Sequence, residues 1–218
     1  MGRTETIETP HGPITAVIEQ KTGSGNLPIL FAHGAGLGQH HDWMVAVRSR
    51  LVDRGHLVMT FDYLYMHEGR KAPDRLPKLL DVHEAAAEAL ENIAGEVVLV
   101  GKSMGGRVGS HLVAQGRCNA LGLVYLGYPL VAMGKTEPRN IDHLLEIDLP
   151  QLFVSGTRDR MGPVEQIDSV AASVPNGSSV LIDDGDHSLI PRKKSGRTLD
   201  DNLDDAVGAI ETWVAGNG

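Results

Sequence analysis

Short apolar runs alternate along this chain with longer segments in which apolar residues recur every three or four positions. The runs are rich in valine, leucine and isoleucine and are bounded by glycine, proline or polar residues, which is the pattern of buried β-strands. The strands predicted in this way cover residues 4–9, 14–19, 28–32, 57–61, 96–100, 120–126, 151–155 and 179–182. The first two are joined by the turn at residues 10–13 and form a hairpin.

The segments with helical spacing lie between these strands. Helices are predicted over residues 42–54, 76–94, 163–174 and 199–215, and another follows Ser103 and ends at Gly116. Asp42 is the predicted N-cap of the first helix, Gly95 ends the second, and Pro163 suits the first turn of another. Residues 21–26 and 62–73 are predicted as loops, and the long connection after residue 126 has room for one short helix at 141–147.

Continuous apolar strands between amphipathic helices predict an α/β fold, in which a mostly parallel sheet has helices on both faces. A chain of 218 residues is expected to fold as a single domain over residues 1–218. In such sheets ligands bind beyond the carboxyl ends of the strands. Functional residues are therefore expected just after strands.

Composition narrows the function further. The net charge of -8 argues against general nucleic-acid binding, and the single cysteine, Cys118, excludes an internal disulfide. No apolar run has the length of a membrane span or a signal peptide. We therefore expect a cytoplasmic protein that binds neither membrane nor nucleic acid; a homodimer is left open.

The strongest motif is G-x-S-x-G at residues 101–105, between a predicted strand and a predicted helix. A strand that turns directly into a helix leaves no room for a Cβ two positions before or after the serine, which explains Gly101 and Gly105. Ser103 would then project at the tip of a nucleophile elbow. A phosphate-binding loop is the alternative, but its first glycine would fall on Glu96.

Three further segments follow predicted strands. An H-G-x-G motif begins at His33 and fits a loop that supplies one backbone N–H to an oxyanion hole, so the hole is predicted at Ala35 and Met104. Asp159 is the candidate triad acid, although it could also be a helix-capping aspartate. His187 is the candidate general base, because it lies between the last strand and the last helix.

Other candidate catalytic or metal-binding residues match the known motifs less well. Asp183, Asp184 and Asp186 are rivals to Asp159 but follow the wrong strand for a Ser, Asp, His order. His83-Glu84 lacks the second histidine of a zinc motif, and Cys118 lies away from the strand ends. No metal and no cofactor is therefore expected.

With these residues in order, the chain resembles the α/β-hydrolase superfamily of serine hydrolases. Residues 101–107, together with 61–63 and 69–74, look like a small subgroup: the testis-expressed and NSL-complex-subunit-3-like proteins and their bacterial relatives. The resemblance implies an α/β-hydrolase fold and hydrolysis of an ester-type acyl bond. Many larger hydrolases carry a lid in the connection after residue 126; here it is too short, so no lid domain and an open site are expected.

The expected mechanism has Ser103 attack an acyl carbon while His187 takes its proton and Asp159 orients His187. A non-catalytic binding module on the same fold and an acyltransferase are the alternatives. Cations gather on segments expected near the site, which suggests a positive rim favouring a small anionic acyl substrate or a protein partner; solvated basic loops are the other interpretation. The residues predicted to bind substrate are Gly34, Lys102, Arg70 and Arg158.

Overall fold

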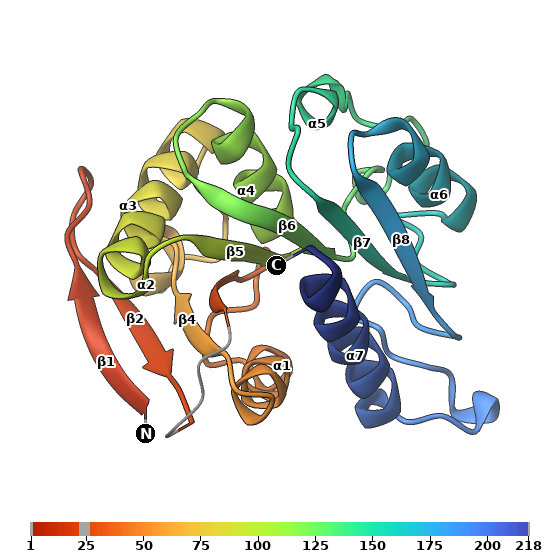
Figure 1. Ribbon diagram of the computed structural model, residues 1–218. Coiled ribbons are helices and arrows are strands. Elements are labelled where there is room, and N and C mark those ends of the chain that lie inside the picture. Colours follow the sequence, from red (N-terminus) through yellow and green to blue (C-terminus); the bar gives the residue numbers. More distant parts are fainter. Residues whose placement is uncertain (1, 22–26, 218) are drawn as a thin grey trace.

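The strands form one eight-stranded sheet in the computed structural model, which describes residues 2–21 and 27–217 (Figure 1). The spatial order is β1-β2-β4-β3-β5-β6-β7-β8. Strand β2 is antiparallel to both of its neighbours, and all other neighbouring pairs are parallel. The strand bounds are β1 Gly2–Ile7, β2 Ile14–Glu19, β3 Pro28–Ala32, β4 Leu57–Phe61, β5 Val97–Lys102, β6 Ala120–Leu126, β7 Gln151–Gly156 and β8 Gly177–Ile182.

Helices cover both faces of this sheet (Figure 1). Helices α1 and α7 lie on one face, and α3, α4 and α6 lie on the other. The helix bounds are α1 Asp42–Asp53, α2 Leu64–His67, α3 Leu76–Ala94, α4 Met104–Ala114, α5 Asp142–Leu145, α6 Val164–Ser173 and α7 Leu199–Asn217, with a 3-10 turn, η1, at Lys193–Ser195. Among the described residues, no helix combines the length and apolarity needed to cross a membrane.

The central strand β5 shows why its sequence is a continuous apolar run. Val98 and Val100 face the layer of α1 and α7, whereas Val97 and Leu99 face α3 and α4. Because helices bury both faces, neither set of alternate positions is polar. The predicted α/β class, with a mostly parallel sheet and helices on both faces, is confirmed.

Most predicted elements lie where the pattern placed them, with ends shifted by one or two residues, as in β1 and α5. Three further details differ. His41, not Asp42, is the N-cap of α1, because its ring accepts a hydrogen bond from the Trp43 N–H. Pro163 is the cap of α6 and lies just outside its first turn. The segment predicted as a loop at 62–73 contains the one-turn helix α2. Of the loop predicted at 21–26, residues 22–26 lie outside the described part of the chain.

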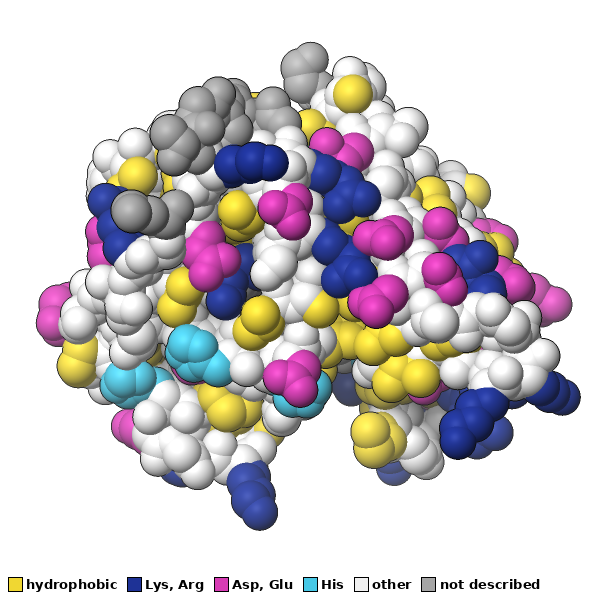
Figure 2. All heavy atoms as spheres, turned by 90° about the horizontal axis from the view of Figure 1, so that it is seen from below, with side chains coloured by type: hydrophobic (Ala, Val, Ile, Leu, Met, Phe, Trp, Pro, Cys, Tyr) yellow, Lys and Arg dark blue, Asp and Glu magenta, His cyan; other side chains and the backbone are white. Residues whose placement is uncertain are grey.

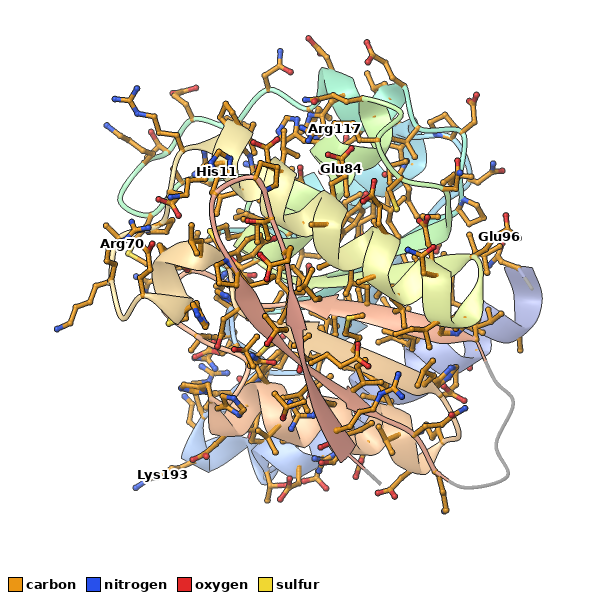
Figure 3. The ribbon with its side chains drawn as sticks, turned by 90° about the vertical axis from the view of Figure 1, so that its left-hand side faces the viewer. His11, Arg70, Glu84, Glu96, Arg117 and Lys193 are labelled. Carbon is orange, nitrogen blue, oxygen red and sulfur yellow. The ribbon has the colours of Figure 1, made fainter. Side chains whose placement is uncertain are left out.

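The β1–β2 hairpin is fastened to α3 by charged side chains. His11 in the hairpin turn binds Asp81 with 2.6 Å between Nε2 and the carboxylate. Arg117, which follows α4, binds both Asp81 and Glu84, and Figure 3 shows His11, Glu84 and Arg117 grouped around α3. This contact fixes the antiparallel edge of the sheet, remote from the strands that carry the candidate site.

The connection between β6 and β7 is short. It contains the four-residue helix α5 and one isolated bridge between Val131 and Pro138. The expectation that no lid domain interrupts the chain here is confirmed. The carboxyl edge of the sheet is therefore open on this side.

Candidate active site

The three candidate triad residues meet at the carboxyl edge of the sheet. Ser103 follows β5, Asp159 follows β7 and His187 follows β8. The Ser103 hydroxyl donates to His187 Nε2 at 2.8 Å, and His187 Nδ1–H donates to Asp159 Oδ2 at 2.8 Å. The structure thus brings together, as one hydrogen-bonded chain, three residues that are far apart in sequence.

Ser103 sits at a strained turn. Its φ of 48° and ψ of -108° lie in a region that residues with a Cβ rarely adopt. A Cβ on Gly101 would lie 2.1 Å from the Gly106 nitrogen, and one on Gly105 would lie 2.5 Å from the Ala32 carbonyl oxygen. Both glycines are therefore required by contact with backbone, as the motif predicted. The geometry places the serine at the tip between strand and helix.

Asp159 is held as a carboxylate. It is only 4% exposed, and burial alone would raise its pKa. Hydrogen bonds from His187 and from the Met161 N–H, the latter 2.7 Å long, outweigh burial, and the charge of Lys102 acts in the same direction, so its pKa is lowered. An ionised Asp159 can fix the His187 tautomer that leaves Nε2 free to accept the serine proton.

The His187 loop is fastened to the neighbouring strand. The Arg158 N–H donates to the Gly185 carbonyl at 2.8 Å, and the Arg158 guanidinium donates to the Asp184 carbonyl at 2.7 Å. Gly156 makes this possible, since a Cβ there would lie 2.2 Å from the Gly185 oxygen. Arg158 therefore positions the loop, and its side chain is engaged rather than free to contact a substrate as predicted.

The H-G-x-G loop after β3 packs against the elbow. A Cβ on Gly34 would lie 3.3 Å from the Lys102 carbonyl oxygen and 3.5 Å from Ser103 Cβ. Met104 is the first residue of α4, and the first N–H groups of a helix have no intrahelical acceptor. The two predicted oxyanion-hole residues, Ala35 and Met104, thus belong to segments that flank the serine.

His33 has a role that the sequence did not reveal. Its ring is fully buried; Nδ1 donates to the Gly34 carbonyl at 2.7 Å and Nε2 accepts from the Tyr63 N–H at 3.1 Å. Burial lowers its pKa, although the Gly34 hydrogen bond and Asp62 oppose this, so the ring is neutral. Because the C=O and N–H of a trans peptide point in opposite directions, the bond to Gly34 turns the Ala35 N–H away from His33.

Lys102 lies beneath the site and not in it, which corrects the expectation that it binds substrate. It is 1% exposed, and its ammonium group donates to the His187 carbonyl and lies 5.6 Å from the centroid of the Trp43 ring. Trp43 itself donates to the Ser188 carbonyl at 2.8 Å. Both side chains support the His187 loop from the layer of α1. The reason is that residue 102 is the last of β5, so its side chain points into the packed face opposite the elbow's opening.

Several arginines of the predicted basic rim are paired with carboxylates. Arg70 binds Glu68 and Asp74, so the expectation that it binds substrate has no support in its contacts. Glu96 directly precedes β5 and so marks the amino edge of the sheet. Figure 3 shows Arg70 and Lys193 on the opposite side of the molecule, at the carboxyl edge. On the face formed by α1 and α7, basic and acidic side chains are interspersed (Figure 2). Further arginines near His187 are also paired: Arg192 with Asp184, and Arg197 with Asp205.

The rival groups have structural roles. Asp184 accepts from the Arg192 N–H at 2.6 Å, and Asp186 accepts from the Ser188 and Ile190 N–H groups. Burial, assisted by Glu91, raises the pKa of the Cys118 thiol to about 12, which makes it a poor nucleophile. In the described part of the chain, no three histidine, cysteine or acidic side chains are grouped as metal ligands would be.

Comparison with known proteins decides the family. The profile of an alpha/beta hydrolase domain matches residues 26–215. The chain belongs to this alpha/beta hydrolase family. The strand order and the absence of a lid are thus those of an α/β-hydrolase fold, and the predicted fold class is confirmed.

Solved structures agree with this assignment. The chain is similar to XC6422 from Xanthomonas campestris, described as a serine hydrolase without a lid, with a TM-score of 0.73, 16% identity, and 97% of this chain and 94% of that chain covered. It is also similar to Est1E from Butyrivibrio proteoclasticus, solved with ferulic acid, with a TM-score of 0.78, 17% identity, and 97% and 99% covered. For a thermophilic esterase from Thermogutta terrifontis the TM-score is 0.75 at 19% identity, with 98% of each chain covered. At these identities the likeness concerns the fold.

Proposed function

We propose that this protein is a serine hydrolase that cleaves an ester-type acyl bond, a carboxylesterase or thioesterase, through a Ser103–His187–Asp159 triad. The observation that carries the proposal is the pair of 2.8 Å hydrogen bonds that joins the three side chains at the mouth of the elbow. His187 takes the Ser103 proton as the serine oxygen attacks the acyl carbon. Asp159 stabilises the imidazolium that forms.

The negative charge that develops on the substrate oxygen needs donors nearby. The N–H of Met104 at the start of α4 supplies one, with the partial positive charge of the helix N-terminus behind it. The N–H of Ala35, whose peptide is held by His33, supplies the other. The imidazolium then protonates the leaving group, and water, deprotonated by His187, releases the acyl group from Ser103.

The absence of a lid favours a small or solvent-exposed substrate over a long acyl chain in a tunnel. Residues 101–107 and 61–63 further suggest the testis-expressed and NSL-complex-subunit-3-like subgroup, and we include the chain among the bacterial relatives of that subgroup as part of this proposal. No cofactor enters the mechanism as proposed.

The test is hydrolysis of short p-nitrophenyl esters and matched thioesters by the wild type and three variants: Ser103→Ala, His187→Ala and Asp159→Asn. Because the three residues act as one unit, each variant should lose kcat by at least ~10³-fold with little change in KM. Circular dichroism and thermal unfolding check that each variant is folded. Equal activity of wild type and Ser103→Ala would overturn the proposal. An acyltransferase would instead show turnover that depends on an added alcohol, thiol or amine, and a binding module would show none.

A further inference from the structure

Arg107 and Arg139 are two of four arginines whose side chains make no hydrogen bond or ion pair within the described residues, 2–21 and 27–217; the others are Arg75 and Arg160. The sequence motifs did not single out Arg107 or Arg139 as a ligand. The arginines discussed above, such as Arg70 and Arg192, all bind carboxylates. In a chain of net charge -8, which has carboxylates to spare, two arginines left unpaired side by side call for an explanation.

Arg107 is directed toward the nucleophile by the geometry of α4. It lies four residues after Ser103, and its N–H donates to the Ser103 carbonyl at 3.1 Å. Residues four apart share one face of a helix, and helical side chains lean toward the N-terminus of the helix. The half-buried side chain of Arg107 therefore leaves α4 on the face of Ser103 and leans toward it.

Arg139 reaches the same place from the β6–β7 connection. Its N–H donates to the Leu130 carbonyl at 2.7 Å, and Leu130 in turn donates from its N–H to the Tyr128 carbonyl at 3.0 Å. The Tyr128 hydroxyl lies 3.5 Å from Ser110 Oγ, which donates to the Arg107 carbonyl at 2.8 Å. Tyr128 thus joins the two segments that carry the arginines.

The charges of the two arginines act on each other. Burial lowers the pKa of Arg107, and the charge of Arg139 lowers it further, opposed only by Tyr128. His111 and His143 stack beside Arg107 with 3.7 Å between ring centroids. Burial, helped by the charge of Arg107, lowers the pKa of each ring to about 4, so both are uncharged near neutrality. An anion between the arginines would relieve this repulsion and could bind bidentately.

A hollow beside Arg139 provides room for the rest of such a ligand. It measures about 330 Å³ and is lined by Leu130, Ile141 and Val170, with Arg139 and the exposed Glu165 as its charged lining residues. A second hollow of about 490 Å³ adjoins it at Gln166 and is lined by Asp159 of the triad. Within the described residues, the buried Gln166 side-chain oxygen between the two hollows has no hydrogen-bond partner. The two hollows together therefore extend from Asp159 to Arg139.

We propose that Arg107 and Arg139 together bind a carboxylate carried by the substrate, so that the protein acts on esters or thioesters with an acid group close to the scissile carbonyl. This inference rests on the proposed function, because it assigns the carboxylate to a substrate of Ser103. Four helical residues rise about 6 Å, so a spacer of about three methylene groups between carbonyl and carboxylate matches the separation. Glutaric acid half-esters have this spacing.

The first experiment measures binding without catalysis. Glutarate is titrated calorimetrically into Ser103→Ala, and into Ser103→Ala combined with Arg107→Met or Arg139→Met. Each arginine substitution should weaken glutarate binding by at least about tenfold, the size expected for losing hydrogen bonds to a charged group. Arg75→Met, which removes an exposed arginine elsewhere in the chain, is the matched control and should leave glutarate affinity unchanged. No binding of glutarate to Ser103→Ala would overturn the proposal.

The second experiment compares kcat/KM for the p-nitrophenyl half-ester of glutaric acid with that for p-nitrophenyl pentanoate. The wild type should prefer the acidic ester by at least about tenfold, and Arg107→Met and Arg139→Met should bring the ratio close to one. A carboxylate on the leaving group is tested in the same way with the pentanoate ester of 4-hydroxybenzoate, and a preference for either acidic ester supports the site. If the wild type shows a kcat/KM ratio of acidic to neutral ester near one for both acidic esters, the proposed carboxylate site is overturned.

These results separate the two proposals. Glutarate binding that depends on Arg107, in a protein that hydrolyses no ester, would leave the anion site standing and refute the hydrolase. Ser103-dependent hydrolysis without glutarate binding and without a preference for acidic esters would support the hydrolase and refute the anion site.

Discussion

The ammonium group of Lys102 donates a hydrogen bond to the main-chain carbonyl of His187. Lys102 is buried at the end of β5, next to Ser103, and His187 is the general base of the proposed triad. One side chain thus connects the strand that positions Ser103 to the loop that positions His187. This bond therefore bears on the distance between the two reacting groups.

Lys102→Met tests this connection. Methionine keeps much of the apolar stem but cannot donate to the His187 carbonyl, so the loop loses one anchor. We expect kcat for a neutral p-nitrophenyl ester to fall about tenfold with KM little changed, since a hydrogen bond from a charged donor contributes about 1.5–3 kcal/mol. Trp43→Phe removes another anchor of this loop, the bond to the Ser188 carbonyl, and should act in the same direction. An unchanged kcat in Lys102→Met would show that the bond does not position His187.

The same lysine should make stability depend on alkaline pH. Burial lowers the pKa of Lys102 from 10.5 to about 8, against the attraction of Asp159 and Asp186. Between pH 8 and 10.5 the unfolded chain therefore binds more protons at this group than the folded protein. The cost of the buried charge is fully present below pH 8 and is relieved as the pH rises through this window.

Urea unfolding of wild type and Lys102→Met at several pH values measures this effect. Other groups titrate in both proteins, so the difference between their free energies of unfolding isolates Lys102. As pH rises from 8 to 10, the free energy of unfolding of the wild type should increase relative to that of Lys102→Met by roughly 1 kcal/mol per pH unit. A difference that stays constant across the window would contradict the assignment of a low pKa to Lys102.

Gly101 of the elbow is predicted to be far more sensitive to substitution than a glycine with open space around it. In Gly101→Ala the new Cβ would meet the Gly106 nitrogen at 2.1 Å, and only backbone movement relieves this contact. The free energy of unfolding should fall by about 3 kcal/mol or more. Gly208→Ala in α7 is the matched control: no atom lies within 4 Å of its added Cβ, and alanine should stabilise the helix by about 0.5–1 kcal/mol. Equal effects of the two substitutions on the denaturation midpoint would refute the steric argument.

Ser103 itself should be held at a cost in stability. Its φ of 48° strains any residue with a Cβ, so Ser103→Ala keeps the strain and Ser103→Gly removes it. We expect Ser103→Gly to exceed Ser103→Ala in free energy of unfolding by about 1 kcal/mol, after the greater flexibility of unfolded glycine is taken into account. If Ser103→Gly is the less stable of the two, the turn is not strained.

The sequence predicted much of this molecule because its strongest patterns are local. The bounds of β3 and β4 follow from short apolar runs, and the steric needs of the elbow follow from Gly101 and Gly105. The order of Ser103, Asp159 and His187 after β5, β7 and β8 was sufficient to nominate the triad, and the fold brings the three within hydrogen-bond distance.

Side-chain direction and pairing could not be predicted in the same way. The motif predicts Lys102 as a surface cation of the elbow. Because Lys102 is the last residue of β5, its side chain instead lies beneath the His187 loop. The sequence predicts Arg158 as a free cation, but its side chain binds the Asp184 carbonyl, which the chain brings close only when the loop after β8 folds back. Arg70 is also predicted to be free, although Glu68 and Asp74 lie close to it in sequence. Whether an arginine is neutralised is a property of the tertiary structure, and no spacing along the chain reports it.

The central claim is that Ser103 is a nucleophile activated by His187, and covalent labelling tests it most directly. The wild type, Ser103→Ala and His187→Ala are treated with a fluorophosphonate, digested and analysed by mass spectrometry to locate the adduct. The account predicts one adduct on the peptide that carries Ser103 in the wild type, none in Ser103→Ala, and a rate reduced by at least ~10³-fold in His187→Ala. A folded wild-type protein that acquires no adduct at Ser103, or acquires it as fast without His187, would contradict it.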